Sequence, residues 1–174
     1  MGAAKESGAD VKVLSIDTFD GTTAYTSDII LAILHGTSQS AQIFNISFGM
    51  YAFNRALYEV IAESNALFIC AVGNNRRSFD DTPSYPAAYD LPNVMSIAST
   101  NQDLGMSFYS NYGTSIDIAA TGRGVRSTLP GNRYGELTGT SMSAAYVSGV
   151  AASVLSYEDM DASTLRGLKK LSPK

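Results

Sequence analysis

One short segment has the residue types and the spacing for nucleophilic chemistry. It reads Gly-Thr-Ser-Met-Ser at residues 139–143 and opens a stretch rich in alanine, serine and glycine. If that stretch is helical, the hydroxyl group of Ser141 projects from its first turn. The backbone N–H of Ser141 then points toward a developing oxyanion, aided by the positive end of the helix dipole. An ordinary serine N-cap is the simpler interpretation of these five residues alone. The α/β-hydrolase elbow is excluded, because Ser143 stands where that motif requires glycine.

The composition excludes several other classes of function. The chain has 174 residues, 45% hydrophobic and 16% charged, which is enough apolar mass for a single domain over residues 1–174. Its formal net charge of -4 offers no basic field to nucleic acid. No apolar run is long enough to span a bilayer. The single cysteine, Cys70, cannot form an intrachain disulfide, and its apolar neighbours predict a buried position.

The elements that must position Ser141 are short strands alternating with helices. Apolar runs bounded by turn residues predict strands at Val11–Ile16, Ile43–Phe48, Leu67–Val72, Asn93–Ala98 and Ser115–Ala119. Helical periodicity and capping residues predict helices at Ser27–Leu34, Asn54–Asn65, Gly139–Glu158 and Asp161–Leu171. This order predicts an α/β fold with a mainly parallel sheet.

Several sequence blocks point to a known family. The segment around Ser141 reads GTSMSAAYVSG, and it follows FYSNYGTSIDIAATGRGVRSTLPGNRYGELTGTS. The blocks NISFG at 45–49 and FICAVGN at 68–74 precede it in order, and VKVLSIDTFDGTTAYTSDIILAI comes first, at 11–33. Together they resemble the subtilisin-like serine proteases, whose signatures include G-T-S-M-[AS]-x-P-H-V-[AS]-G, N-x-S-L-G and A-A-G-N. The resemblance covers nearly the whole chain. It implies a three-layer α/β/α fold, incomplete at its N-terminal side, and a serine endopeptidase acting on polypeptides.

The resemblance also assigns roles to individual residues. Ser141 would be the acylated nucleophile, and Asn74 would donate its side-chain amide to the oxyanion beside the N–H of Ser141. The substrate cleft would have two edges that pair with an extended peptide, and a pocket for the residue before the scissile bond. The residues implied for the cleft and its pocket are Gly21, Thr22, Thr23, Ser47, Phe48, Gly49, Ala71 and Gly73.

The general base of the family is not matched. A nucleophilic serine needs a base, which the family takes from a histidine in H-G-T-H, oriented by an aspartate in D-[ST]-G. Asp17 and His35 stand in the family order, but His35 precedes Ser47 by only about a dozen residues, too few for the strand, turn and helix that normally intervene. We therefore expect His35 at the end of a helix away from the cleft. A further departure is Ala145-Tyr146, where the family has Pro-His.

The chain thus resembles a catalytic domain that begins after the histidine motif, and we expect little proteolytic activity from it alone. The missing part is another chain or a cleaved piece, or the chain is truncated, or it is a degenerate protein. The rival functions are an inactive peptide-binding pseudoprotease and a structural partner whose sheet gap recruits another chain.

Expected partners are a polypeptide substrate and, in the first of these explanations, the missing N-terminal part of the catalytic domain as a separate chain. No nucleic acid and no membrane span are expected. Family members often bind calcium, but no acidic loop here has the spacing of a calcium site, so no cofactor and no metal ligand is assigned. The start, MGAAKESGAD, does not resemble a signal peptide, and only the habit of the family suggests secretion or the cell surface.

Overall fold

Four parallel strands form the central sheet. The structure is a computed structural model that describes residues 10–158. The strands lie side by side in chain order: β1 (Ile43–Ile46), β2 (Leu67–Ala71), β3 (Val94–Thr100) and β4 (Ile118–Thr121). In the register, Ile43 lies opposite Leu67, and Ile97 lies opposite Ile118. Because the strands are parallel, their carboxyl ends meet at one edge of the sheet, which is where the loops that carry candidate site residues begin.

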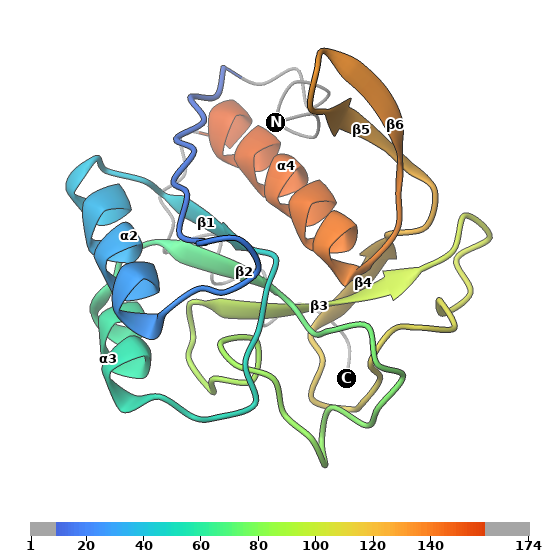
Figure 1. The fold of residues 1–174 in the computed structure, drawn as a ribbon, viewed down its shortest axis with the longest axis horizontal. Coiled ribbons are helices and arrows are strands. Elements are labelled where there is room, and N and C mark those ends of the chain that lie inside the picture. Colours follow the sequence, from blue (N-terminus) through green and yellow to red (C-terminus); the bar gives the residue numbers. More distant parts are fainter. Residues whose placement is uncertain (1–9, 159–174) are drawn as a thin grey trace.

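Helices cover both faces of this sheet (Figure 1). α2 (Thr26–Ser38) and α3 (Arg55–Glu63) pack on one face, and α4 (Thr140–Glu158) packs on the other. Every residue of β2 is buried, because alternate side chains join the core on opposite faces. This explains why the strand appears as a continuous apolar run in the sequence. The α/β fold with three layers and a mainly parallel sheet is confirmed.

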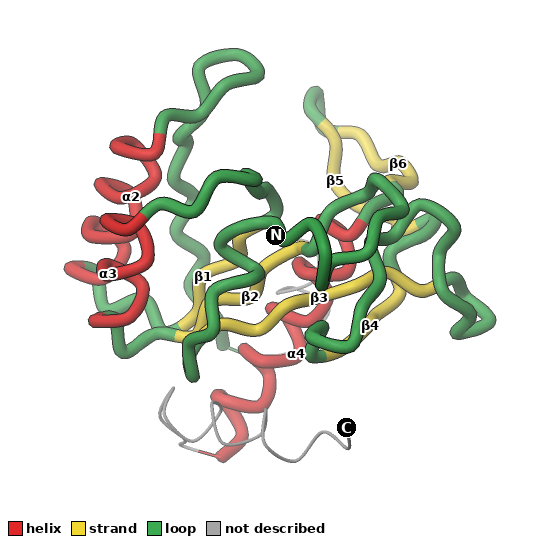
Figure 2. Tube along the Cα trace, turned by 90° about the horizontal axis from the view of Figure 1, so that it is seen from below, coloured by secondary structure: helices red, strands yellow, loops and turns green. Residues whose placement is uncertain are grey.

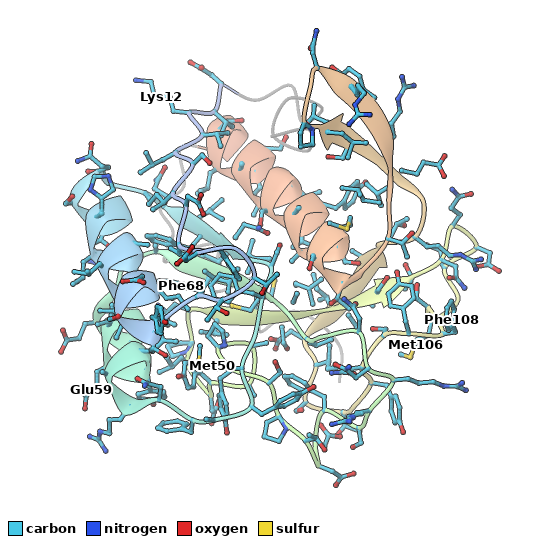
Figure 3. All side chains as sticks on the ribbon, in the orientation of Figure 1. Lys12, Met50, Glu59, Phe68, Met106 and Phe108 are labelled. Atoms are coloured by element: carbon cyan, nitrogen blue, oxygen red, sulfur yellow. The ribbon has the colours of Figure 1, made fainter. Side chains whose placement is uncertain are left out.

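The core beneath α2 and α3 is centred on Phe68. Its ring is completely buried and stacks on Phe44, with 4.8 Å between the ring centroids. Figure 3 places Phe68 between the sheet and these two helices. Ile33 of α2 and Leu57 of α3 belong to the same cluster. Cys70 also lies in it and is fully buried, as its neighbours predicted. Burial of an aromatic ring such as Phe68 contributes about 2 kcal/mol to folding.

Capping and small residues set the helix boundaries. α3 begins after Asn54, whose side-chain oxygen accepts the N–H of Leu57 at 3.0 Å, so the expected helix over 54–65 is confirmed with slightly shorter bounds. α2 runs to Ser38, four residues beyond its expected end, and Tyr25 at its N-cap makes no side-chain cap. α4 is helical throughout, as its small residues predicted. The expected helix at Asp161–Leu171 lies outside the described residues.

Three expectations about strands need correction. Val11–Ile16 is not a strand, because no strand of residues 10–158 pairs with it, and an isolated extended segment has no ladder to join. The strand expected from Ser115 begins instead at Ile118, since Asp117 is held by side-chain bonds to Ser96. An antiparallel hairpin of β5 (Val125–Leu129) and β6 (Arg133–Leu137) was not expected at all.

Figure 2 shows the hairpin standing apart from the main sheet. Its turn, Pro130-Gly131-Asn132, places Gly131 and Asn132 at positive φ, a conformation that glycine and asparagine tolerate best.

None of the helices within residues 10–158 combines the length and apolar character needed to cross a membrane.

Candidate active site

The first turn of α4 carries Ser141 and is anchored by glycines. Gly139 has φ +154, which disfavours any side chain, and its N–H donates to the carbonyl of Gly122 at 2.9 Å. The N–H of Met142 in turn donates to the carbonyl of Gly139 at 3.0 Å. A Cβ at Gly122 would collide with the hydroxyls of Ser143 and Ser99, so this close approach also requires glycine. The turn therefore holds Ser141 at one fixed place on the helix.

Ser141 and the end of β1 are joined by two hydrogen bonds. The hydroxyl of Ser141 donates to the carbonyl of Ser47 at 2.8 Å, and the hydroxyl of Ser47 donates to the carbonyl of Ser141 at 3.1 Å. Asn45 supports this pair, because its side-chain amide donates to the hydroxyl of Ser47 at 2.9 Å. Ser141 is half-buried. The proton of its hydroxyl is therefore directed to a neutral carbonyl.

Asn74 follows β2 and is oriented by Thr140. The backbone N–H and the hydroxyl of Thr140 both donate to Oδ1 of Asn74, at 2.8 and 3.0 Å. These two bonds fix the orientation of the amide and leave its Nδ2 as the outward group. Thr140 itself is fully buried and also accepts the N–H of Gly73 at 3.2 Å. The N–H of Ser141 lies in the first turn of α4, where backbone donors have no acceptor within the helix. The amide of Asn74 and the first turn of α4 thus each carry a donor, and Thr140 links the two segments.

The loop that carries Asn74 is held by Asn111, which the sequence did not single out. Nδ2 of Asn111 donates to the carbonyl of Val72 at 2.8 Å, and its Oδ1 accepts the N–H groups of Asn75 and Arg77, both at 3.1 Å. Its own N–H donates to the carbonyl of Gly73 at 3.0 Å. Asn111 is 1% exposed. A single buried amide therefore fixes both sides of Asn74, and no local sequence signal indicates this, because its partners are backbone groups distant in the chain.

The two expected cleft edges are brought together by an aromatic contact. Gly21 and Thr22 form a tight turn closed by bonds between Asp20 and Thr23, at 2.9 and 3.1 Å. Phe19, just before this turn, packs edge-on against Phe48, with 5.6 Å between centroids. The turn is exposed, as is Gly49 on the other edge.

Gly73 and Ala71, the residues expected to line the pocket, have different surroundings. Gly73 has φ +106, and a Cβ there would come within 2.8 Å of the Asn111 amide. Ala71 is 5% exposed, and its side chain packs in the cluster under α4. A Cβ added at Gly49 would collide with the hydroxyl of Ser84. Gly73 therefore presents only backbone next to Asn74, whereas Ala71 belongs to the core and not to an open pocket.

A hydrogen-bonded carboxylate ties the loop after Asn74 to the segment before β4. Asp80 accepts the N–H groups of Thr114 at 2.8 Å and Ser115 at 3.0 Å, together with the hydroxyls of both residues. The hydroxyl of Ser115 and the two backbone donors lower the pKa of Asp80 to about 2. Asp80 is thus a charged anchor at the surface.

A comparison with protein families identifies the family of this chain. The model of the subtilase family matches residues 5–171. The chain belongs to the subtilase family. The chain is also similar in sequence to individual subtilases. It is 36% identical over 154 residues to the major intracellular serine protease of Bacillus subtilis (strain 168), covering 86% of this chain and 47% of the relative. It is 30% identical over 158 residues to thermitase of Thermoactinomyces vulgaris, covering 88% of this chain and 54% of the relative.

Solved structures agree with the sequence relatives. The fold matches patellamide maturation protease PatA with a TM-score of 0.76 and 28% identity, over 86% of this chain and 59% of that one. It matches a cold adapted subtilisin-like serine proteinase with a TM-score of 0.75 and 26% identity, over 85% and 55% of the two chains. This chain spans about half the length of the curated relatives that it matches.

No histidine forms a hydrogen bond with Ser141 among the residues described. His35, its only histidine, is exposed in the last turn of α2, the helix that leads to the amino end of β1, whereas Ser47 follows the carboxyl end. Asp17 accepts the N–H of Phe19 at 3.1 Å in a local turn. Neither forms a hydrogen bond with Ser141 or Asn74. Within residues 10–158 the hydroxyl of Ser141 donates to the carbonyl of Ser47, a neutral group that cannot act as a general base.

The acidic residues do not fit a calcium site. Across residues 10–158, no three His, Cys, Asp or Glu side chains lie close enough together to hold a metal ion. Calcium favours several carboxylate and carbonyl oxygens at one point. We therefore derive no step that uses a metal.

Proposed function

We propose that this subtilase chain supplies the nucleophile, the oxyanion hole and the substrate cleft of a serine endopeptidase acting on polypeptides. The general base and the carboxylate that orients it come from a partner polypeptide, the missing N-terminal part of the catalytic domain. The observation that carries this proposal is the arrangement around Thr140, which holds the amide of Asn74 through two hydrogen bonds directly next to the first turn that bears Ser141. A decayed site would have no reason to keep this pairing.

The chemistry would be acyl transfer to serine. Oγ of Ser141 leaves the carbonyl of Ser47 and attacks the scissile carbonyl carbon, while the partner's base takes its proton. The carbonyl oxygen becomes an oxyanion and accepts bonds from Nδ2 of Asn74 and the N–H of Ser141. The C–N bond then breaks, and the leaving amine takes the proton from the base. Water attacks the resulting ester by the same route in reverse and releases the acid.

Asn74 contributes through the transition state. Its donor group is exposed and fixed before substrate arrives, so no reorganisation is needed when negative charge develops. Removing one such donor costs about 3 kcal/mol, a magnitude that was itself measured on a subtilisin. Without a base, the remaining oxyanion stabilisation leaves only a small residual rate.

The cleft would bind an extended peptide between its two edges. Residues 47–49 and 21–23 are placed near each other by the contact of Phe19 with Phe48. Backbone groups along such edges accept an added strand by main-chain hydrogen bonds, independent of side-chain type. Gly73, which precedes Asn74 and has no side chain, would leave space for the side chain that precedes the scissile bond.

The second candidate is an inactive peptide-binding pseudoprotease. The hydrogen bond from the Ser141 hydroxyl to the carbonyl of Ser47 favours this candidate, because without a base the hydroxyl keeps its proton and no turnover occurs. This candidate keeps the same cleft and binds the same extended peptides, but forms no acyl-enzyme.

Mass spectrometry of the acyl-enzyme separates the two candidates. The chain is mixed with the part of the Bacillus subtilis relative that precedes its match, and an activated peptide ester is added. We expect a covalent acyl adduct on Ser141 in the mixture and none with Ser141→Ala. An assembled complex that binds the peptide without forming the adduct would overturn the proposal and favour the pseudoprotease.

A further inference from the structure

A buried group of hydroxyl side chains lies next to the candidate active site. Ser99, near the end of β3, and Ser107, in the loop that follows, are 0% and 1% exposed. Their hydroxyl oxygens lie 3.0 Å apart, and the oxygen of Ser99 lies 2.7 Å from the hydroxyl of Tyr109. Figure 3 labels the same loop at Met106 and Phe108. Buried hydroxyls are costly unless each has a partner, so these contacts hold the loop against β3.

This group of hydroxyls ends at the carbonyl of Gly122, just after β4. The hydroxyl of Tyr109 donates to this carbonyl at 3.0 Å. A carbonyl has no proton to give, and a tyrosine hydroxyl has only one. Because that proton is used on Gly122, Ser99 supplies the proton between itself and Tyr109. The donors thus point in one direction, from the buried end of β3 through Tyr109 to Gly122.

Gly122 in turn holds the start of α4. The carbonyl that accepts from Tyr109 also accepts the N–H of Gly139 at 2.9 Å, two residues before Ser141. Both glycines are buried, and a Cβ on Gly122 would come within 2.6 Å of the carbonyl of Gly139. Atoms packed this closely cannot move independently. A shift of Gly122 is therefore passed to the turn that carries Ser141.

The backbone of Tyr109 reaches the other half of the site. Its carbonyl accepts the N–H of Arg76 at 2.9 Å. Arg76 follows Asn74 in the same loop and has φ +51, a conformation that is uncommon for residues other than glycine. The bond to Tyr109 helps to hold the loop in this conformation. Tyr109 is thus connected to both segments that carry the candidate oxyanion donors.

We propose that Tyr109 is a positioning residue for the oxyanion hole. This inference rests on the proposed function, in which the N–H of Ser141 and the amide of Asn74 bind the oxyanion. The hydroxyl of Tyr109 fixes the carbonyl of Gly122 and, through it, the direction of the Ser141 N–H. The main-chain carbonyl of Tyr109 fixes the loop that carries Asn74.

The hydroxyl of Tyr109 is the group that can be tested on its own. Phenylalanine at this position keeps the ring and the main-chain carbonyl, and it removes only the bond to Gly122 and the acceptor of the Ser99 proton. Groups that act in a transition state must be held within about 0.5 Å of their productive positions. Loss of the bond behind the turn should therefore lower the rate without preventing peptide binding.

Amide hydrogen exchange tests the proposal on this chain alone, without partner or catalysis. Tyr109→Phe should speed exchange of the Gly139 amide by about fivefold or more, because the acceptor carbonyl of Gly122 is then held less firmly. The control is Ile33→Val, which lowers stability by a similar amount in the core beneath α2. The control should speed exchange of the Phe68 amide in the central sheet and leave Gly139 within about twofold.

Steady-state kinetics separates positioning from folding. The chain is mixed with the N-terminal portion of the Bacillus subtilis relative that precedes its match, and a peptide ester is the substrate. Tyr109→Phe should lower kcat about tenfold and leave KM within about twofold, because the N–H of Ser141 acts in the transition state. Tyr112→Phe is the matched control, since the hydroxyl of Tyr112 forms no hydrogen bond with a described residue, and it should change neither constant.

Three results would overturn the proposal. They are unchanged exchange at Gly139 in Tyr109→Phe, equal speeding of that amide by Tyr109→Phe and Ile33→Val, and a rise in KM with unchanged kcat. If the complex of the natural chain has no activity, the proposed function fails, and exchange at Gly139 alone then decides whether Tyr109 positions the turn.

Discussion

At the start of α4, nearly every polar group around Ser141 has a partner within the chain, whereas the outer edge of β1 presents backbone groups with none. Hydrogen bonds of Thr140, Asn111 and Ser47 join residues that are 66, 39 and 94 positions apart in the chain. The edge of β1, only one residue from Ser47, faces exposed apolar side chains across an open groove. The chain itself therefore holds the groups around Ser141 in place, whereas it leaves the outer edge of β1 as an open surface.

This contrast has a physical consequence for stability. Residues in the completed half are held by partners in the same chain, so they contribute to folding of the chain alone. The outer edge of β1 has no ladder partner within residues 10–158, so its backbone groups contribute less to folding of the chain alone. Substitutions in the two regions should accordingly differ in their effect on stability.

The largest effect on stability is expected for Phe68→Ala. Phe68 is fully buried and stacked on Phe44, so truncation leaves a cavity and costs about 4 kcal/mol of unfolding free energy. Leu14→Ala, at the open edge, should cost less than about 0.5 kcal/mol in the isolated chain. Urea unfolding of both variants measures this difference. Similar losses for the two would break the contrast between the regions.

A slightly smaller effect, this time on rate, is expected for Asn74→Ala. In the complex with its partner, loss of the oxyanion donor should lower kcat by about a hundredfold or more with little change in KM. The control is Asn75→Ala, which removes the neighbouring exposed amide, a group that accepts from Tyr51. Steady-state hydrolysis of a peptide ester measures both. A rise in KM with unchanged kcat would show that Asn74 binds substrate and does not stabilise the transition state.

Asn111→Ala should cost about 2 kcal/mol of stability, because the carbonyl of Val72 and two backbone N–H groups lose their buried partner. Amide exchange at Asn75 and Arg77 should speed up in the same variant. The control is Gln102→Ala, which removes an exposed amide. Unchanged exchange at these two amides would show that the loop around Asn74 is held by other contacts.

The smallest effect concerns acid stability. The folded pKa of Asp80 is about 2, below its ordinary value of 3.8, so the unfolded chain binds more protons in this range. The contribution of Asp80 is therefore complete above about pH 4 and is lost as the pH falls toward about 2. Asp80→Asn should flatten this part of the stability curve, while Asp81→Asn should not. Circular dichroism measures stability against pH for the natural chain and the two variants. Parallel stability curves for all three would show that Asp80 is not such an anchor.

The sequence predicted the elements whose signals are local. The apolar run at 67–72 predicted β2, and the Asn54 cap and periodicity predicted α3, because each pattern depends on neighbours in the chain. The expected strand at Val11–Ile16 was wrong for the opposite reason. Its composition suits a strand, but strand formation needs a partner, and none of the described residues provides one.

The site was predicted only where residue type and position suffice. Ser141 and Asn74 were selected from motifs, and the structure places them in adjacent elements joined by Thr140. Asn111 was missed because its partners are backbone groups, which leave no trace in residue type. The β5–β6 hairpin was missed although Pro130-Gly131-Asn132, between two runs that alternate in polarity, is a recognisable turn signal.

Labelling by a fluorophosphonate probe tests the central claim most directly. The probe reacts with a serine hydroxyl only when a base activates it. We expect no labelling of the isolated chain, clear labelling of Ser141 when the N-terminal portion of the relative is added, and none with Ser141→Ala. Labelling of the isolated chain that Ser141→Ala abolishes would contradict the account, because it would mean that this chain already contains its own base.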